Sequence, residues 1–324
     1  MKLTSGDIAN IVEGTLSGNP DLIVNDLVTD SRQISLTGEM AFFAIPGRNH
    51  DGHTFIDSLY DKGVRVFIVE RLPENNYRLE EASIITVRNT IEALQLLAAE
   101  RRKAFRSPVI AITGSSGKTI VKEWLADVVG MTTPVIRSPK SYNSQIGVPL
   151  SVWMLDEKYK MAIIEAGISL PGEMEKIRKV VDPDIGILTN IGDAHSENFR
   201  NNEAKAREKL KLFRNVSRLI YCSDQDLVRK LIRKDKEFLK KEIIDWSCEN
   251  RNASVFVKIT NRDTGKTSLE MTHKGIVHDF IIPFSDGASV ENAITVASSC
   301  LALGIDPAVI NRGLSGLVSV AMRM

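Results

Sequence analysis

The sequence predicts an α/β protein with two domains, the second built on a mainly parallel sheet. At 324 residues the chain is long enough for two domains of ordinary size. Short apolar runs alternate with helical segments along it, and beyond residue 108 these runs no longer alternate with polar residues. Such runs are typical of strands that helices cover on both faces. The predicted domains are residues 1–106 and 107–324.

Composition and charge exclude several classes of protein. The chain is 43% hydrophobic and 26% charged, which is typical of a soluble globular protein. With 42 Lys plus Arg against 41 Asp plus Glu, no bulk field would hold it on nucleic acid or an anionic membrane. No stretch approaches the ~18 apolar residues that span a bilayer, and the three cysteines fit neither a disulfide framework nor a zinc site. We therefore expect a cytoplasmic protein with no nucleic-acid partner and no membrane insertion.

Residues 1–106 are expected to form a small α/β domain. Its strands are the β-rich runs at 40–45, 64–69 and 84–87, with a helical segment after the first. The domain closes with a helix over 90–105, whose basic end suits a helix carboxyl terminus. The pair Ser107-Pro108 disfavours helix, so the boundary is placed there.

The second domain begins with buried strands that are followed by helices. The expected parallel strands are the apolar runs at 109–113, 161–167, 184–190 and 218–223. Helices are expected from about Lys118 and Pro171. Three antiparallel strands are expected at 254–259, 268–271 and 276–282. The last two helices are expected at 288–303 and 307–314. Because ligands of parallel sheets bind beyond the carboxyl ends of the strands, the functional site is expected there.

The strongest local signal is a glycine-rich turn between the first of these strands and its helix. Its residues are Gly114, Ser115, Ser116, Gly117, Lys118 and Thr119. Backbone N–H groups of such a turn face phosphate oxygens, Lys118 would neutralise the β/γ-phosphates, and the Thr119 hydroxyl can bind Mg²⁺. Ile112 stands where the general pattern GxxxxGK[ST] has its first glycine, so the loop is of a shortened type. The alternative is a plain turn with an incidental lysine, and we favour nucleoside triphosphate binding.

Three downstream residues are candidates at the same sheet edge. Glu165 ends an apolar run, where a carboxylate needs a partner such as a divalent cation, although a solvated strand-end glutamate is the alternative. A loop histidine is more often a surface residue, but His195 follows the next strand, which favours a ligand role. Lys209 lies in a basic segment whose plain interpretation is a solvated helix face.

These segments together resemble the Mur ligases of peptidoglycan synthesis, and the MurF type in particular. TGSSGKT is similar to the family's TGxxGKT, SYNSQIGVPLS to NNxIGVPL, AIIEAGISLPGEM to VVEMGxSxPGEI, and TNIGDAHSENF to TNIGxAHxExF. The segment TDSRQISLTGEMAFFAIPGRNHDGHTFI resembles the family's UDP-sugar-binding domain. Its matching positions, which the resemblance implies bind the UDP substrate, are Ser31, Arg32, Asp51, Gly52 and His53. The similarity covers nearly the whole chain.

The resemblance implies an ATP-dependent amide ligase. It would phosphorylate the terminal carboxylate of a UDP-N-acetylmuramoyl tripeptide, after which the amine of D-alanyl-D-alanine attacks the acyl phosphate. It implies that Lys118 holds the γ-phosphate and that Thr119 and Glu165 bind one Mg²⁺. A second Mg²⁺ would be bound by His195 and supported by carbamylated Lys209.

The resemblance also implies further nucleotide contacts and a missing part. The remaining ATP-binding residues would be Asn143, Asn292 on the adenine side, and Arg323 near the hinge. Departures from the family pattern, which weaken inferences about substrate contacts, occur at Ile120, Ser144, Gln145, Lys211 and Glu291. Mur ligases carry a third, Rossmann-like domain, which we expect beyond Met324. The chain would then be the first two domains of a longer protein, and fusion to an alanine racemase is one known arrangement.

Two other functions stay open. A MurE-like ligase, or a folylpolyglutamate or cyanophycin synthetase, is disfavoured by the NSQIGVPL and IGDAHSENF stretches. A non-catalytic nucleotide-binding module is disfavoured because Lys118, Thr119, Glu165 and His195 are all present.

Overall fold

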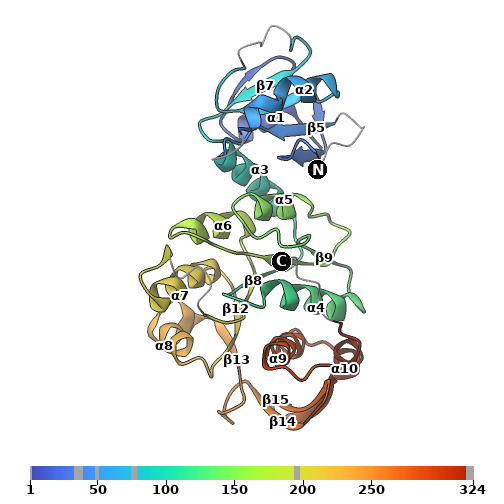
Figure 1. The fold of residues 1–324 in the computed structure, drawn as a ribbon, viewed down its shortest axis with the longest axis vertical. Helices are drawn as coiled ribbons and strands as arrows, with labels where there is room; N and C mark the ends of the chain where they lie inside the picture. Colours follow the sequence, from blue (N-terminus) through green and yellow to red (C-terminus); the bar gives the residue numbers. More distant parts are fainter. Residues whose placement is uncertain (1, 33–38, 48–50, 74–78, 193–197, 319–324) are drawn as a thin grey trace. The chain divides into compact units, whose positions relative to one another are not determined.

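The computed structural model describes residues 2–32, 39–47, 51–73, 79–192 and 198–318 (Figure 1). The chain divides into two compact units. Unit 1 comprises residues 1–104 with 152–154, and unit 2 comprises residues 105–151 and 155–324. The predicted domain boundary, between residues 106 and 107, falls close to this division.

Unit 1 is a small α/β sheet structure. Its five-stranded sheet has the order β2 (Thr15–Ser17), β7 (Ser83–Thr86), β6 (Val66–Val69), β5 (Met40–Phe43) and β4 (Asp26–Val28). The strands pair in parallel except β2 with β7. A second, two-stranded sheet joins β1 (Leu3–Thr4) and β3 (Ile23–Val24). The helices are α1 (Ser5–Ile11), η1 (Gly52–Phe55), α2 (Ile56–Asp61) and α3 (Thr90–Ala104).

The core of unit 1 explains why these runs form strands. All residues of β5 and β6 are buried, which fits apolar strands covered on both faces. Phe42 and Phe67 meet edge to face with ring centroids 6.5 Å apart. Glu70 then fixes the start of α3, because its Oε1 accepts hydrogen bonds from the backbone N and the hydroxyl of Thr90, at 2.8 and 3.0 Å.

Unit 2 contains a nine-stranded, mainly parallel sheet. Its order is β16 (Ile276–Ile282), β15 (Lys266–His273), β14 (Val255–Asp263), β13 (Glu242–Ser247), β12 (Arg218–Cys222), β11 (Ile185–Leu188), β8 (Val109–Thr113), β10 (Met161–Glu165) and β9 (Val135–Arg137). The expected antiparallel strands are confirmed as β14 to β16. The sequence analysis missed β9, which is short, and β13, whose run EIIDWS mixes polar and apolar residues.

Helices cover both faces of this sheet. They are α4 (Lys118–Gly130), α5 (Gly147–Trp153), α6 (Glu173–Val181), α7 (Asn202–Leu210), η4 (Lys211–Phe213), α8 (Asp226–Lys234), η5 (Phe238–Lys240), α9 (Gly287–Ala302) and α10 (Pro307–Ser315). α4, α9 and α10 share one core with the sheet and lie beside one another (Figure 1). On the opposite face, the ring of Phe213 packs so closely on Gly186 that a Cβ there would collide with it.

The register of the parallel strands fixes where a site can form. Glu165 at the end of β10 pairs with Ile112 of β8, and Leu188 at the end of β11 pairs with Thr113. The loops that leave β8, β10 and β11 therefore start at one edge of the sheet, as the sequence predicts for a ligand site. Within the described part of the chain, no helix is long and apolar enough to span a membrane.

Candidate functional site

The glycine-rich turn after β8 has the conformation that its sequence requires. Gly117, which caps the start of α4, has φ 77°, a left-handed value that glycine adopts without strain. A Cβ on Gly117 would also collide with the side chain of Asn292, and a Cβ on Gly114 with the hydroxyl of Thr189. Asn292, only 6% exposed on α9, therefore lies against the turn, and its ATP-binding role stays a prediction.

Two residues that the sequence analysis did not single out hold this turn in place. The backbone N of Ser115 donates to the carbonyl of Asn190 at 2.8 Å, and the backbone N of Ser116 donates to Asn190 Oδ1 at 3.0 Å. The hydroxyl of Thr189 donates to the carbonyl of Ser116 at 2.6 Å. The sequence signal was present, because both polar residues follow the apolar run of β11.

Lys118 and Lys209 share one acceptor. The Nζ atoms of both residues lie 3.0 Å from the carbonyl oxygen of Gly114. Burial lowers the pKa of Lys118, against the opposing charge of Glu165. Burial, reinforced by the charges of Lys118 and Lys205, lowers the pKa of Lys209 to about 7.

The interpretation of Lys209 as part of a solvated basic face is wrong. Its side chain is only 3% exposed and its amine points into the turn. Composition could not reveal this, because burial of α7 depends on how the helix docks beside the turn.

Glu165 is the centre of a buried polar cluster. It is fully buried, so the alternative of a solvated strand-end glutamate is excluded. The hydroxyl of Thr119 donates to Glu165 Oε2 at 2.9 Å, and Asn143 Nδ2 donates to Oε1 at 2.6 Å. The expected neighbours Thr119 and Glu165 are thus brought together, and Asn143 joins them.

This cluster suits a magnesium ion. Glu165 and Thr119 present the oxygen atoms that a hard cation prefers. No group of three or more His, Cys, Asp or Glu residues close enough to hold a metal occurs among the residues that the structure describes. A cation here would therefore take its other ligands from phosphate oxygens and water.

Two predicted site residues lie outside the described part of the chain. They are His195 and Arg323. Their predicted roles, a second metal ligand and a nucleotide contact near the hinge, stay predictions.

Unit 1 brings together several of the predicted UDP-binding residues. Ser31, Arg32 and Gly52 line a hollow of about 510 Å³, together with Phe42 and Phe55. The Arg32 side chain is 86% exposed and pairs with Asp30 at 2.7 Å. Hydrogen bonds from Arg32 lower the pKa of Asp30 to about 2. Nε and Nη2 of Arg32 both donate to Asp30, so a phosphate group would bind the other N–H groups of this exposed guanidinium or displace Asp30.

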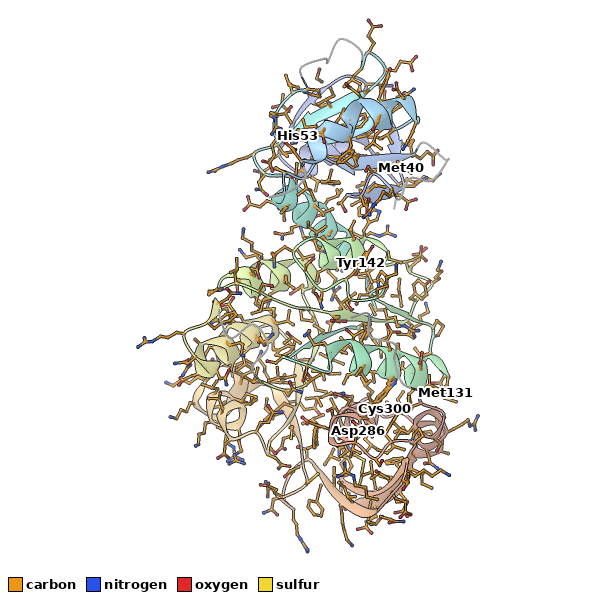
Figure 2. All side chains as sticks on the ribbon, viewed as in Figure 1. Met40, His53, Met131, Tyr142, Asp286 and Cys300 are labelled. Atoms are coloured by element: carbon orange, nitrogen blue, oxygen red, sulfur yellow. The ribbon has the colours of Figure 1, made fainter. Side chains whose placement is uncertain are left out.

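Asp51 and His53 brace each other beside this hollow. His53 Nδ1 lies 2.7 Å from Asp51 Oδ1, and the backbone N of Glu70 donates to His53 Nε2 at 3.1 Å. His53, which is labelled in Figure 2, is therefore the Nδ1-protonated tautomer, and both of its ring nitrogens are hydrogen-bonded within unit 1. Burial alone would raise the pKa of Asp51, but hydrogen bonds from His53 and Arg71 outweigh it and hold the pKa at about 2.

Two family models match the chain. The family model described as the Mur ligase middle domain matches residues 112–300. A second model, described as the Mur ligase family catalytic domain, matches residues 24–102.

Two curated relatives match the whole chain, and both are named UDP-N-acetylmuramoyl-tripeptide--D-alanyl-D-alanine ligase. The protein from Bacillus subtilis strain 168 is 29% identical over 334 residues, and the chain covers 69% of it. The protein from Buchnera aphidicola subsp. Acyrthosiphon pisum strain APS is 30% identical over 331 residues, and the chain covers 70% of it. Neither name mentions a racemase, so these relatives give no support to the expected racemase fusion.

Solved structures agree with the fold of the whole chain. A crystal structure of MurF from Acinetobacter baumannii superposes with a TM-score of 0.89 at 25% identity, over 99% of this chain and 69% of that one. MurF ligase from Thermotoga maritima in complex with ADP has a TM-score of 0.78 at 25% identity, over 91% of this chain and 66% of that one.

The contribution of the Asp51 contacts to stability can be tested by lowering the pH. The pKa of Asp51 in the folded chain is about 2, below its ordinary value of 3.8, so its contribution to stability is fully present above about pH 4. That contribution is lost as the pH falls towards about 2. We expect Asp51→Asn to lower stability near neutral pH by on the order of 1 kcal/mol, and the difference from wild type to shrink over this acid range. Thermal unfolding followed by circular dichroism measures it.

The control is Asp61→Asn, the same change at an exposed position of α2. A difference between Asp51→Asn and wild type that stays constant from neutral pH to about pH 2 would contradict the bracing.

Proposed function

The chain belongs to the Mur ligase family, and we propose that it binds ATP with Mg²⁺ for the joining of D-alanyl-D-alanine to a UDP-N-acetylmuramoyl tripeptide. The observation that carries this proposal is the phosphate-binding turn at the end of β8, with the buried Glu165 beside Thr119. The substrates are those that the names of its relatives state. The chain would act in peptidoglycan synthesis, in the cytoplasm.

The residues of unit 2 suit the phosphoryl step. The Lys118 ammonium donates to the backbone carbonyls of Gly114 and Ser115, and phosphate oxygens would replace these acceptors when nucleotide binds. The start of α4 at Lys118 adds partial positive charge at the same point. A magnesium ion held by Thr119 and Glu165 supplies further charge neutralisation when bound.

The reaction then needs positioning more than covalent chemistry by the protein. A carboxylate oxygen of the tripeptide attacks the γ-phosphorus and ADP leaves. The dipeptide amine next attacks the carbonyl carbon, phosphate leaves and the nitrogen loses a proton. Both steps depend on holding charged groups together, which is what the buried cluster around Glu165 and the turn would do.

Carbamylation of Lys209 is a further part of the proposal. Carbon dioxide reacts with a neutral amine, giving a carbamate and releasing a proton. With a pKa of about 7, a substantial fraction of Lys209 is neutral at physiological pH, whereas an exposed lysine is almost wholly protonated. The carbamate would remove the repulsion between Lys209 and Lys118 and supply oxygen atoms to a metal or to His195.

Unit 1 suits the nucleotide end of the tripeptide substrate. The hollow beside Arg32 is lined by Ser31 and Gly52 and by the aromatic rings of Phe42 and Phe55. An arginine matches the oxygens of a diphosphate, and the partly exposed ring of Phe55 suits the uracil base, whereas Phe42 is only 1% exposed and packs on Phe67. Asp51 and His53 would act by fixing the turn that carries Gly52, rather than through free side-chain groups.

The phosphate-binding role predicts a loss of ATP affinity in Lys118→Ala. Removal of the ammonium that faces the β/γ-phosphates should weaken ATP binding at least about tenfold, or ~1.4 kcal/mol. Isothermal titration calorimetry with ATP and Mg²⁺ measures this. Lys179→Ala, at an exposed position of α6, is the control and should bind as wild type does. Equal affinities of Lys118→Ala and wild type would refute the assignment.

The role of unit 1 predicts that Arg32→Ala weakens binding of UDP-N-acetylmuramoyl tripeptide. Loss of a charged, forked donor to a diphosphate should reduce affinity by about tenfold. Arg88→Ala removes an equally charged and exposed side chain from unit 1 and serves as the control. If calorimetry finds the two variants indistinguishable, the hollow is not the diphosphate site.

The carbamate predicts that Lys209→Ala loses ligase activity in the full-length protein and partly regains it with a small carboxylic acid. The added acid would restore the missing carboxylate-like oxygens. Lys230→Ala, exposed on α8, is the control. Wild-type activity of Lys209→Ala would remove Lys209 from the mechanism, and loss without any rescue would argue against the carbamate.

A further inference from the structure

Lys122 is a fully buried lysine one turn of α4 beyond Lys118. Three oxygen atoms surround its ammonium. Nζ lies 2.9 Å from Glu123 Oε1 and 3.6 Å from Glu165 Oε2, and it also donates to the carbonyl of Lys140. The Glu123 and Lys140 oxygens lie within hydrogen-bond distance and Glu165 Oε2 lies at ion-pair distance, so protein groups already hold this buried ammonium. Its role must therefore differ from that of Lys118.

The contact with Lys140 connects Lys122 to the loop that follows β9. Lys140 has φ 48°, a left-handed value that is uncommon for a residue with a side chain. This loop continues through Tyr142 (Figure 2) to Asn143, which donates to Glu165 at 2.6 Å. By holding the Lys140 carbonyl, Lys122 fixes the part of the chain that brings Asn143 to the carboxylate.

The charges around Lys122 alternate from the surface to the core. Asp127 pairs with Arg137 at 2.8 Å, and Arg137 pairs with Glu123 at 2.6 Å. Lys122 then stands between Glu123 and the fully buried Glu165. Three carboxylates and two cations leave this row with one net negative charge. The row therefore places a cation beside Glu165 and still keeps net negative charge that attracts a divalent cation.

We propose that Lys122 is a positioning residue for the metal-binding carboxylate. It holds Glu165 with Oε2 towards the Thr119 hydroxyl and ties down the loop of Asn143, so that the oxygen ligands stand ready before nucleotide and Mg²⁺ arrive. The inference rests on the proposed binding of nucleotide with Mg²⁺. It concerns how strongly the metal strengthens nucleotide binding, a property distinct from nucleotide affinity itself.

The test compares the affinity of the chain for AMP-PNP, a non-hydrolysable ATP analogue, in excess Mg²⁺ and in EDTA. The ratio of the two dissociation constants measures the contribution of the metal. In Lys122→Met we expect this ratio to fall at least about tenfold, while affinity in EDTA stays within about twofold of wild type. An unchanged ratio, or an equal loss in both conditions, would show that Lys122 is merely structural and overturn the proposal.

A second variant keeps the buried ammonium and removes its other carboxylate. In Glu123→Gln, Lys122 is free to centre on Glu165 and compete with the metal, so the ratio should fall at least about threefold. Circular dichroism checks that each variant is folded. If Lys122→Met does not fold, an unchanged ratio in Glu123→Gln overturns the proposal by itself.

The control is Arg137→Gln, which removes a positive charge from the exposed part of the row. It should leave the ratio near the wild-type value because Lys122 still holds Glu165, and a fall equal to that of Lys122→Met would overturn the proposal. A wild-type chain that binds no AMP-PNP would refute the proposed function as well. If wild type binds AMP-PNP more tightly in Mg²⁺ than in EDTA, the proposed function stands, and a failed variant result then counts only against the role of Lys122.

Discussion

Glu165 carries its charge at the end of a strand that is otherwise apolar, and a carboxylate in that position is stable only among cations and hydrogen-bond donors. The phosphate-binding edge of unit 2 is arranged around this requirement. Thr119 and Asn143 donate to its two oxygens, and Lys122 stands 3.6 Å away. The start of α4, the loop after β9 and the end of β10 are thereby fixed to one point.

The same edge concentrates positive charge beside that carboxylate. Lys118 and Lys209 converge on the Gly114 carbonyl, and burial, followed by the charges of Lys118 and Lys205, lowers the pKa of Lys209. Bringing these ammonium groups together costs Coulomb energy when no anion is bound, and the oxygens of a triphosphate would reduce that repulsion. The contacts from Thr189 and Asn190 keep the turn in place, so that lysine side chains rather than the backbone are free to move.

The sequence predicted the main elements of this site better than the residues that hold them in place. β8, the turn and α4 were predictable because an apolar run, glycines and a helix follow each other locally, and Glu165 stood out as a charge in an apolar run. Lys122 could not be recognised from the sequence, because a lysine in a helix is usually solvated. Its burial depends on contacts with the loop of Lys140 and with strand β10. Lys209 and Asn190 were underestimated for the same reason, since their contacts join residues far apart in the chain.

A crystal structure of the chain with Mn²⁺ and AMP-PNP would test the central role of Glu165 most directly, because anomalous scattering locates the metal. We predict a metal peak at coordination distance from both Glu165 Oε2 and Thr119 Oγ1, with the Lys118 ammonium moved from the Gly114 carbonyl to the phosphates. A metal bound to the nucleotide but distant from Glu165, with Thr119 still donating to that carboxylate, would contradict the account.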